Sequence, residues 1–181
     1  MASKSLIAIV GLPASGKTSA IEGIKDIGTI VTMGDIIREE ALHQGLEPTS
    51  ENIGKLAKSL RNDHGEDIIA QRCIDKIQNL TDKIILIDGI RSTAEVERFR
   101  ERWKLYVIAI TTPEEIRFNR ILKRGRSDDP TNIDQILERD RRELQFGLRE
   151  VIDNAEFVII NNQDVSSLQK KIKKLVEELL A

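Results

Sequence analysis

Apolar runs alternate with longer amphipathic segments along this chain. Five runs rich in Ile and Val predict strands, at residues 6–10, 29–33, 83–87, 105–111 and 156–160. Apolar residues barely alternate with polar ones within them, which is typical of parallel strands that are buried on both faces. Helical patterns follow from residue 18 and at residues 35–44, 48–62, 65–79, 92–103, 113–123, 132–152 and 164–180. Strands that alternate with helices in this way predict an α/β fold with a parallel sheet.

A glycine-rich segment directly follows the first predicted strand. Residues 11–18 fit the phosphate-binding P-loop pattern G-x-x-x-x-G-K-[ST], between a strand and a helix as the motif requires. The glycines let backbone N–H groups turn toward a phosphate, and the helix adds its positive end. We expect Lys17 to reach the β- and γ-phosphates of ATP and Thr18 to hold Mg²⁺. The predicted donor-nucleotide contacts are Gly11, Leu12, Pro13, Ala14, Ser15, Gly16, Lys17, Thr18 and Ser19.

Composition limits what such a chain does. Its 181 residues are 40% hydrophobic and 32% charged, which favours one soluble domain over residues 1–181. A net charge of -2 argues against a general nucleic-acid binder, so we expect no DNA partner, while an RNA or protein partner stays open. The single cysteine, Cys73, leaves no internal disulfide and no zinc cluster of paired cysteines. No apolar run approaches the roughly 20 residues of a membrane span, and no signal peptide precedes the first strand, which predicts a cytoplasmic protein without a membrane partner.

Charged residues follow the third and second predicted strands, where ligands bind in open α/β sheets. Asp88 stands where P-loop enzymes place the acid that organises Mg²⁺, and Arg91 lies close enough to grip an anionic substrate. Asp35 and Arg38 open the helix after the second strand and lie one turn apart on one face. The alternative interpretation is that both acids cap helices and both arginines face solvent.

These segments resemble those of nucleoside monophosphate kinases of the adenylate kinase superfamily. That family binds its acceptor phosphate with a glycine-Asp-x-x-Arg segment after strand two and an Asp-Gly-x-x-Arg-like segment after strand three. Gly34-Asp35 with Arg38, and Asp88-Gly89 with Arg91, match these segments, although Arg91 falls one position early. The resemblance implies that Gly34, Asp35, Arg38, Asp88, Gly89 and Arg91 bind the acceptor, and that Thr18 and Asp88 hold the metal.

Over roughly residues 5–175 the chain is more closely similar to archaeal adenylate-kinase-related P-loop proteins. The similarity lies in residues 31–35, 88–92, 123–130 and 138–144. It implies a three-layer P-loop NTPase fold with strand order 2-3-1-4-5. It also implies a helical acceptor-binding region at about residues 34–80 and a short lid at about residues 124–131.

Arginines recur from Arg117 to Arg142, interleaved with acidic residues. In phosphoryl transfer, arginines that swing in neutralise the charge shared by donor and acceptor. The resemblance implies that Arg120 and Arg124, four positions apart, contact ATP, and that Arg126 with Arg139 or Arg142 contacts the transferring phosphate. The predicted catalytic residues are Lys17, Asp35, Arg91, Arg124 and Arg126. The interleaved acids leave open a solvated face of ion pairs instead.

The segment after the last strand, residues 161–164, reads Asn-Asn-Gln-Asp. Its N-x-x-D pattern is similar to the guanine-reading loop of GTPases, but the lysine of that loop is missing, as is an Asp-x-x-Gly switch after strand three. In P-loop kinases this segment touches the donor base, which makes Asn161 a candidate. A helix cap at Asn162 or Asp164 is the alternative.

The sequence as a whole therefore predicts an ATP- and Mg²⁺-dependent phosphotransferase that acts on a nucleoside monophosphate such as AMP. A phosphate oxyanion as acceptor requires no general base. A first alternative is transfer to a sugar hydroxyl, as in dephospho-coenzyme A kinases, with Asp35 as the base. A second is a nucleotide-binding switch or slow ATPase that acts through a protein or RNA partner.

Overall fold

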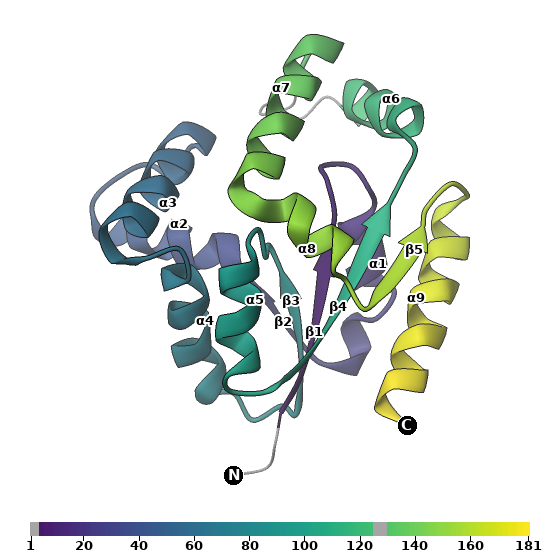
Figure 1. The fold of residues 1–181 in the computed structure, drawn as a ribbon, viewed down its shortest axis with the longest axis horizontal. Coiled ribbons are helices and arrows are strands. Elements are labelled where there is room, and N and C mark those ends of the chain that lie inside the picture. The colour runs from purple at the N-terminus through teal and green to yellow at the C-terminus, as the bar shows by residue number, and fades with distance from the viewer. Residues whose placement is uncertain (1–3, 125–129) are drawn as a thin grey trace.

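A five-stranded parallel sheet forms the centre of the molecule (Figure 1). The computed structural model describes residues 4–124 and 130–181. The strands are β1 (Ser5–Val10), β2 (Thr29–Thr32), β3 (Ile84–Asp88), β4 (Lys104–Thr111) and β5 (Phe157–Ile160). Their order is β2-β3-β1-β4-β5, which confirms the predicted order. β1 therefore lies between β3 and β4, and the loop that follows it emerges at the middle of the sheet.

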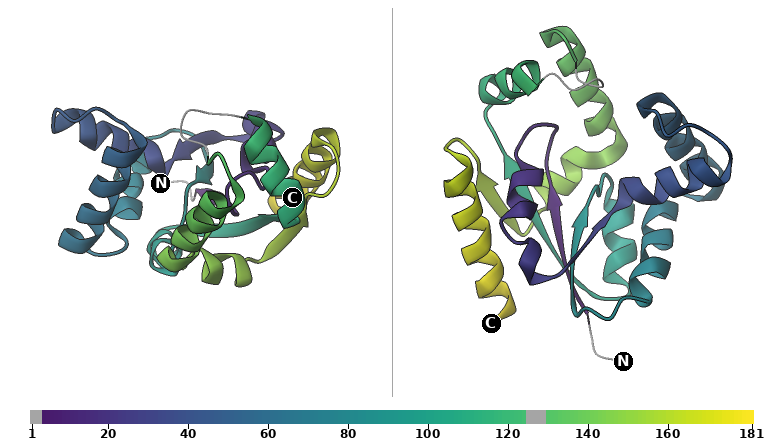
Figure 2. Two further views of the ribbon diagram at one scale, coloured as in Figure 1. Left: turned by 90° about the horizontal axis from the view of Figure 1, so that it is seen from above. Right: turned by 180° about the vertical axis from the view of Figure 1, so that it is seen from behind.

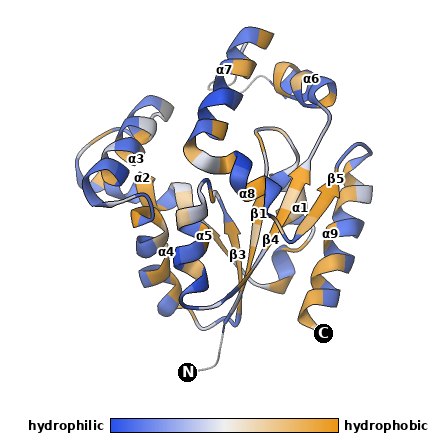
Figure 3. Ribbon diagram, in the orientation of Figure 1, coloured by the Kyte–Doolittle hydropathy of each residue, from blue (hydrophilic) through white to orange (hydrophobic). Residues whose placement is uncertain are grey.

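Helices cover both faces of this sheet, giving the three layers that the sequence predicts (Figure 2). One face packs on α1 (Lys17–Glu22) and α9 (Val165–Leu180) through an apolar cluster that includes Ile7 and Ile9. The other packs on α4 (Ile68–Gln78), α5 (Thr93–Arg100) and α8 (Arg149–Asp153) through Leu6 and Ala8. Successive residues of β1 thus enter opposite layers, as the two-residue period of a strand requires. Figure 3 shows the strands as the most hydrophobic part of the ribbon.

Four further helices stand beyond the carboxyl ends of the strands, in two groups (Figure 1). α2 (Met33–His43) and α3 (Ser50–His64) lie on the β2 side and belong to the predicted acceptor region, residues 34–80. α6 (Glu114–Arg124) and α7 (Ile133–Glu143) flank the predicted lid. Residues 125–129, with the predicted catalytic Arg126, lie outside the described residues. None of the described helices has the length and apolar character needed to cross a membrane.

The single helix predicted over residues 132–152 is wrong. α7 ends at Glu143, and a kinked segment, η2 (Leu144–Leu148), separates it from α8. Gly147 has φ 101 there, in the left-handed region that glycine adopts without strain. A Cβ at this position would lie 3.4 Å from the Cα of Ser92, so the chain bends where its backbone packs on the loop after β3.

Candidate active site

Side-chain donors hold the loop between β1 and α1 by its carbonyl oxygens. Lys17 Nζ donates to the carbonyls of Gly11 and Leu12 at 2.8 and 3.1 Å. The next three carbonyls also accept: Pro13 from Arg117 at 3.0 Å, Ala14 from Arg120 at 3.5 Å, and Ser15 from both Thr112 and Asn161 at 2.8 Å. Carbonyls engaged in this way do not point at a bound phosphate, so the loop can present N–H groups to it.

Two loop glycines are required by close packing. A Cβ on Gly11 (φ +149) would lie 2.4 Å from the carbonyl oxygen of Ile110, at the end of β4. A Cβ on Gly16 (φ +107) would lie 2.3 Å from Asn161 Nδ2, just after β5. The ends of two strands therefore shape the loop, and the resulting glycine cradle fits the phosphates of a nucleotide. The contacts predicted for residues 11–19 stay predictions.

Lys17 and Asp88 both lie where burial disfavours their charge. Burial lowers the pKa of Lys17, and the carboxylates of Asp88 and Glu143 oppose that shift. Burial raises the pKa of Asp88, and the cations of Lys17 and Arg91 oppose it. A ligand with anionic phosphates near Lys17 and a cation near Asp88 would stabilise both ionised forms.

The described part of the chain has no cluster of side chains that would bind a metal ion without a nucleotide. Residues 4–124 and 130–181 contain no group of three or more His, Cys, Asp or Glu that would hold a metal ion. Mg²⁺ in kinase sites is bound through one or two protein groups together with substrate phosphates. The exposed Thr18 and the half-buried Asp88 fit an ion that arrives with its nucleotide.

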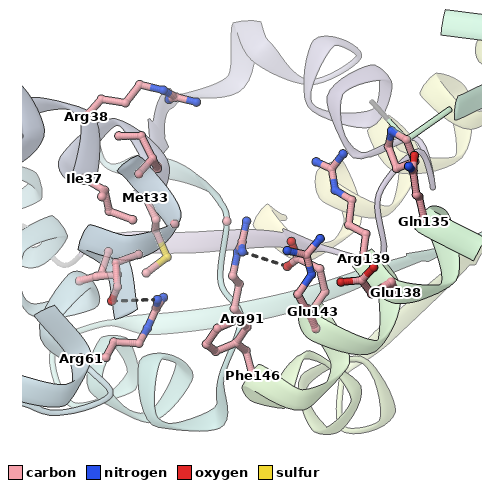
Figure 4. Close-up of a pocket in the computed structure, with 18 residues that line it drawn as sticks. Met33, Ile37, Arg38, Arg61, Arg91, Gln135, Glu138, Arg139, Glu143 and Phe146 are labelled. Carbon is pink, nitrogen blue, oxygen red and sulfur yellow. Dashed lines mark hydrogen bonds and ion pairs between the residues drawn. The ribbon is translucent and has the colours of Figure 1, made fainter. Parts of the chain in front are cut away.

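A cavity of about 540 Å³ opens between α2, α3, the end of β3 and α7 (Figure 4). Its polar wall includes six of the predicted acceptor and lid positions: Gly34, Arg38, Gly89, Arg91, Arg139 and Arg142. These residues come from three separate stretches of the sequence. Two of the cavity arginines lie close enough to Lys17 to interact with it, since Arg91 and Arg139 both lower its pKa. The structure thus brings the predicted acceptor segments together beside the P-loop lysine.

Two of these arginines form ion pairs with carboxylates of the protein itself. Arg38 forms an ion pair with Asp35 one turn earlier on α2. Arg91 Nη1 lies 3.0 Å from Glu143 Oε2, at the end of α7 (Figure 4). Asp35 is the predicted base of the hydroxyl-acceptor alternative, and its side chain is 53% exposed. An anionic ligand would replace these carboxylates on the guanidinium groups.

Sequence reasoning missed other residues of the cavity. Arg61 from α3 and Phe146 from η2 both line it, with the guanidinium carbon of Arg61 5.9 Å from the ring centroid of Phe146. Glu138 and Glu143 line it too. Phe146 stands next to Gly147, and a glycine inside an otherwise helical pattern was the one available signal that the chain bends there.

Two other residues lie against the P-loop. Arg117, counted among the lid arginines, is buried under the P-loop, where it binds both carboxylate oxygens of Asp140 and the carbonyl of Pro13. Asn161 is also buried, and its side-chain amide donates to the carbonyl of Ser15, while its contact with the donor base stays a prediction. Both side chains therefore stabilise the P-loop by donating hydrogen bonds to its backbone carbonyls.

Comparison with known proteins supplies the family. A family model described as an AAA domain matches residues 7–144. A UPF0200 protein of Methanosarcina mazei is 40% identical over 178 residues, which cover 97% of this chain and 95% of that protein. The chain belongs to the UPF0200 family. A "UPF0200/UPF0201 protein" of Archaeoglobus fulgidus is 44% identical over 179 residues, and the match covers 96% of this chain but only 55% of that longer protein.

Solved structures show the fold of this UPF0200 protein. TT1252 from Thermus thermophilus has a TM-score of 0.65 at 16% identity, covering 98% of both chains. Shikimate kinase from Acinetobacter baumannii in complex with shikimate has a TM-score of 0.58 at 14% identity, covering 99% of this chain and 94% of that one. The predicted three-layer P-loop fold is therefore confirmed.

Proposed function

We propose that this UPF0200 protein is an ATP- and Mg²⁺-dependent kinase that transfers the γ-phosphate to a nucleoside monophosphate such as AMP. One observation carries the proposal: the arginines at positions 38, 91, 139 and 142 line a single cavity, and two of them, Arg91 and Arg139, lie within electrostatic reach of the P-loop lysine. Phosphoryl transfer depends on positioning and on cations around the phosphates, which is what such a wall supplies.

Each part of the site has a role in that transfer. The loop N–H groups and Lys17 hold the donor phosphates, with Arg120 beside the loop. Arg38 and Arg91 hold the acceptor phosphate, while the proposed lid arginines, Arg124, Arg126, Arg139 and Arg142, surround the γ-phosphate. Mg²⁺, held with Thr18 and Asp88, would supply positive charge to the phosphate oxygens. An acceptor phosphate oxygen then forms a bond to the γ-phosphorus as the bond to ADP breaks, and no proton has to be removed.

The apolar wall supports an acceptor that carries a planar ring. Met33, Ile37, Ile53 and Ala57 line the cavity opposite the lid arginines, and Phe146 adds the one aromatic ring among the described lining residues. A nucleobase stacks on such a surface, whereas a sugar presents hydroxyl groups that need polar partners. This favours a nucleoside monophosphate over a sugar as the acceptor.

An acceptor screen tests the proposal. The protein is incubated with ATP and Mg²⁺ and, separately, with AMP, CMP, UMP, GMP, shikimate and dephospho-coenzyme A, and phosphorylated product is measured by chromatography. We expect product with a nucleoside monophosphate, and Arg91→Met should lower kcat/KM for that acceptor by about 100-fold. Arg98→Met is the matched control, because Arg98 pairs with Asp67 and Glu101 and does not line the cavity.

The same screen contains the test of the hydroxyl-acceptor alternative. If Asp35 is a general base, Asp35→Asn lowers turnover by about 100-fold or more with little change in acceptor binding. We expect turnover to change far less, because a phosphate acceptor needs no base. Product from dephospho-coenzyme A together with the large loss in Asp35→Asn would replace our proposal with that alternative.

One comparison favours a second candidate, a nucleotide switch that acts through a protein partner. The Archaeoglobus relative joins two family names in one chain, and this protein matches 55% of it. The remaining segment of that relative, produced separately, is the probe. Binding of this segment with ATP but not without nucleotide, together with ATP hydrolysis and no acceptor product, would support the switch.

A further inference from the structure

Glu95 is a buried carboxylate that the proposed reaction does not use. It lies in the first turn of α5 and is 0% exposed. Its Oε2 accepts the backbone N–H of Arg91 at 2.8 Å, and its Oε1 accepts from Arg61 Nη2, also at 2.8 Å. One side chain therefore joins two walls of the cavity, the loop after β3 and helix α3.

Helix capping accounts for neither of these contacts. Ser92 caps α5, since its Oγ accepts the N–H of Glu95 at 3.3 Å, and Ser-x-x-Glu is the sequence of a capping box. In a capping box the glutamate accepts the N–H of the N-cap residue itself, here Ser92, whereas Glu95 accepts the N–H of Arg91, one residue earlier. The bond to Arg61 reaches a different helix, so capping does not explain it.

The Arg61–Glu95 pair is nearly removed from solvent. The side chains of Arg61 and Glu95 are 15% and 0% exposed. A buried ion pair adds little net stability compared with apolar residues, but losing one partner is costly because it leaves a buried charge uncompensated. Such a pair holds its two elements in one relative position. Here one element carries Arg91 and the other carries Arg61 beside Phe146.

We propose that Glu95 is a positioning residue that couples α3 to the Arg91 loop, so that both walls of the cavity are set together. Arg91 is placed for the acceptor phosphate only when α3 is seated through Arg61. The consequence for the acceptor rests on the proposed function. The coupling itself is a property of the ligand-free protein and is measured without substrate.

Hydrogen exchange on the ligand-free protein tests the coupling. Arg61→Met, a change in α3, should speed amide exchange at residues 89–92, and Glu95→Gln should speed exchange in both that loop and the end of α3. If Arg61→Met does not fold, the double variant Arg61→Met/Glu95→Gln removes the uncompensated charge, and its exchange at residues 89–92 should match that of Glu95→Gln alone, because the coupling runs through Glu95. Unchanged exchange at residues 89–92 in Arg61→Met, or faster exchange there in the double variant than in Glu95→Gln, would overturn the proposal.

Glu156→Gln is the matched control. Glu156 also accepts a backbone N–H, that of Val107 at 2.8 Å, and pairs with an arginine, Arg100, but it does not line the cavity. Its substitution removes the same two kinds of contact elsewhere in the fold. It should leave exchange at residues 89–92 as it is in the unchanged protein.

Kinetics then separate positioning from a general structural effect. Glu95→Gln should raise KM for the acceptor by about tenfold and leave KM for ATP within about twofold, because misplacement of a binding group weakens what that group holds. Glu156→Gln should change neither KM. Equal changes in both KM values, or the same kinetics for Glu95→Gln and Glu156→Gln, would leave Glu95 a structural residue and overturn the proposal. If the unchanged protein phosphorylates no nucleoside monophosphate, the proposed function fails, and the exchange result still decides the role of Glu95.

Discussion

Two ionisable residues of this site, Lys17 and Asp88, are buried where the protein interior disfavours their charged forms. Burial raises the pKa of Asp88 above its ordinary value, and burial lowers that of Lys17. Because the charge of each group is the largest that opposes the other's pKa shift in the ligand-free protein, the pair is poised for a ligand that brings a cation and phosphates together. Sites of this kind commonly cost stability in exchange for function.

Asp88→Asn should therefore stabilise the ligand-free protein while it weakens Mg²⁺-dependent activity. A raised pKa means that the folded protein holds the carboxyl proton more tightly than the unfolded chain does. The ionised carboxylate then destabilises the fold as the pH rises above the ordinary value of 3.8, until the pH passes the raised pKa. Thermal denaturation should show a higher Tm for Asp88→Asn at pH 7, by about 2–4 °C per kcal/mol gained, and no such gain near pH 4. A lower Tm than the unchanged protein at pH 7 would contradict this.

Phe146 should matter only to acceptors that carry a base. Stacking of a base on an aromatic ring contributes roughly 1–3 kcal/mol, so Phe146→Ala should raise KM for AMP by about tenfold. Ribose 5-phosphate, which lacks the base, should respond to the variant little or not at all. Leu46→Ala is the control, because Leu46 is 39% exposed against 43% for Phe146 and lies outside the cavity. An equal loss with both compounds would refute stacking.

Among the elements, the bend between α7 and α8 shapes the site most. It packs the backbone at Gly147 on the loop of Arg91 and Ser92, and it directs Phe146 into the cavity. The buried Arg117–Asp140 pair joins α6 to α7 and also binds the P-loop at Pro13. The lid helices, the loop and the acceptor wall are thus connected through a few polar contacts.

Two glycines should respond to alanine with opposite signs. Gly147→Ala places a side chain at positive φ against Ser92 and should lower the free energy of unfolding by about 1–2 kcal/mol. Gly54→Ala, within α3 and with nothing within 4 Å of the added Cβ, should raise it by about 0.5–1 kcal/mol. Denaturant titration of both variants measures the difference. A Gly147→Ala protein as stable as the original would show that the bend does not need glycine.

At the scale of the whole molecule, local patterns predicted the sheet well. Unbroken apolar runs and the P-loop marked the strands and their parallel arrangement, since such signals lie within a few neighbouring residues. The helix over residues 132–152 was wrong because its bend at Gly147 depends on a contact with Ser92, far away in the sequence. Arg61, Glu95 and Phe146 were missed for the same reason, since only tertiary packing brings Arg61 and Phe146 to the cavity and Glu95 to Arg61.

The central claim is that the arginine-lined cavity receives the phosphate held at the P-loop. ATP labelled at its γ-phosphate, incubated with Mg²⁺ and AMP, measures this directly through the destination of the label. The account predicts that the label enters ADP formed from AMP, that Lys17→Met abolishes this transfer, and that Arg98→Met preserves it. If the label appears only as inorganic phosphate, at the same rate with each of AMP, CMP, UMP and GMP as without an acceptor, the account is contradicted.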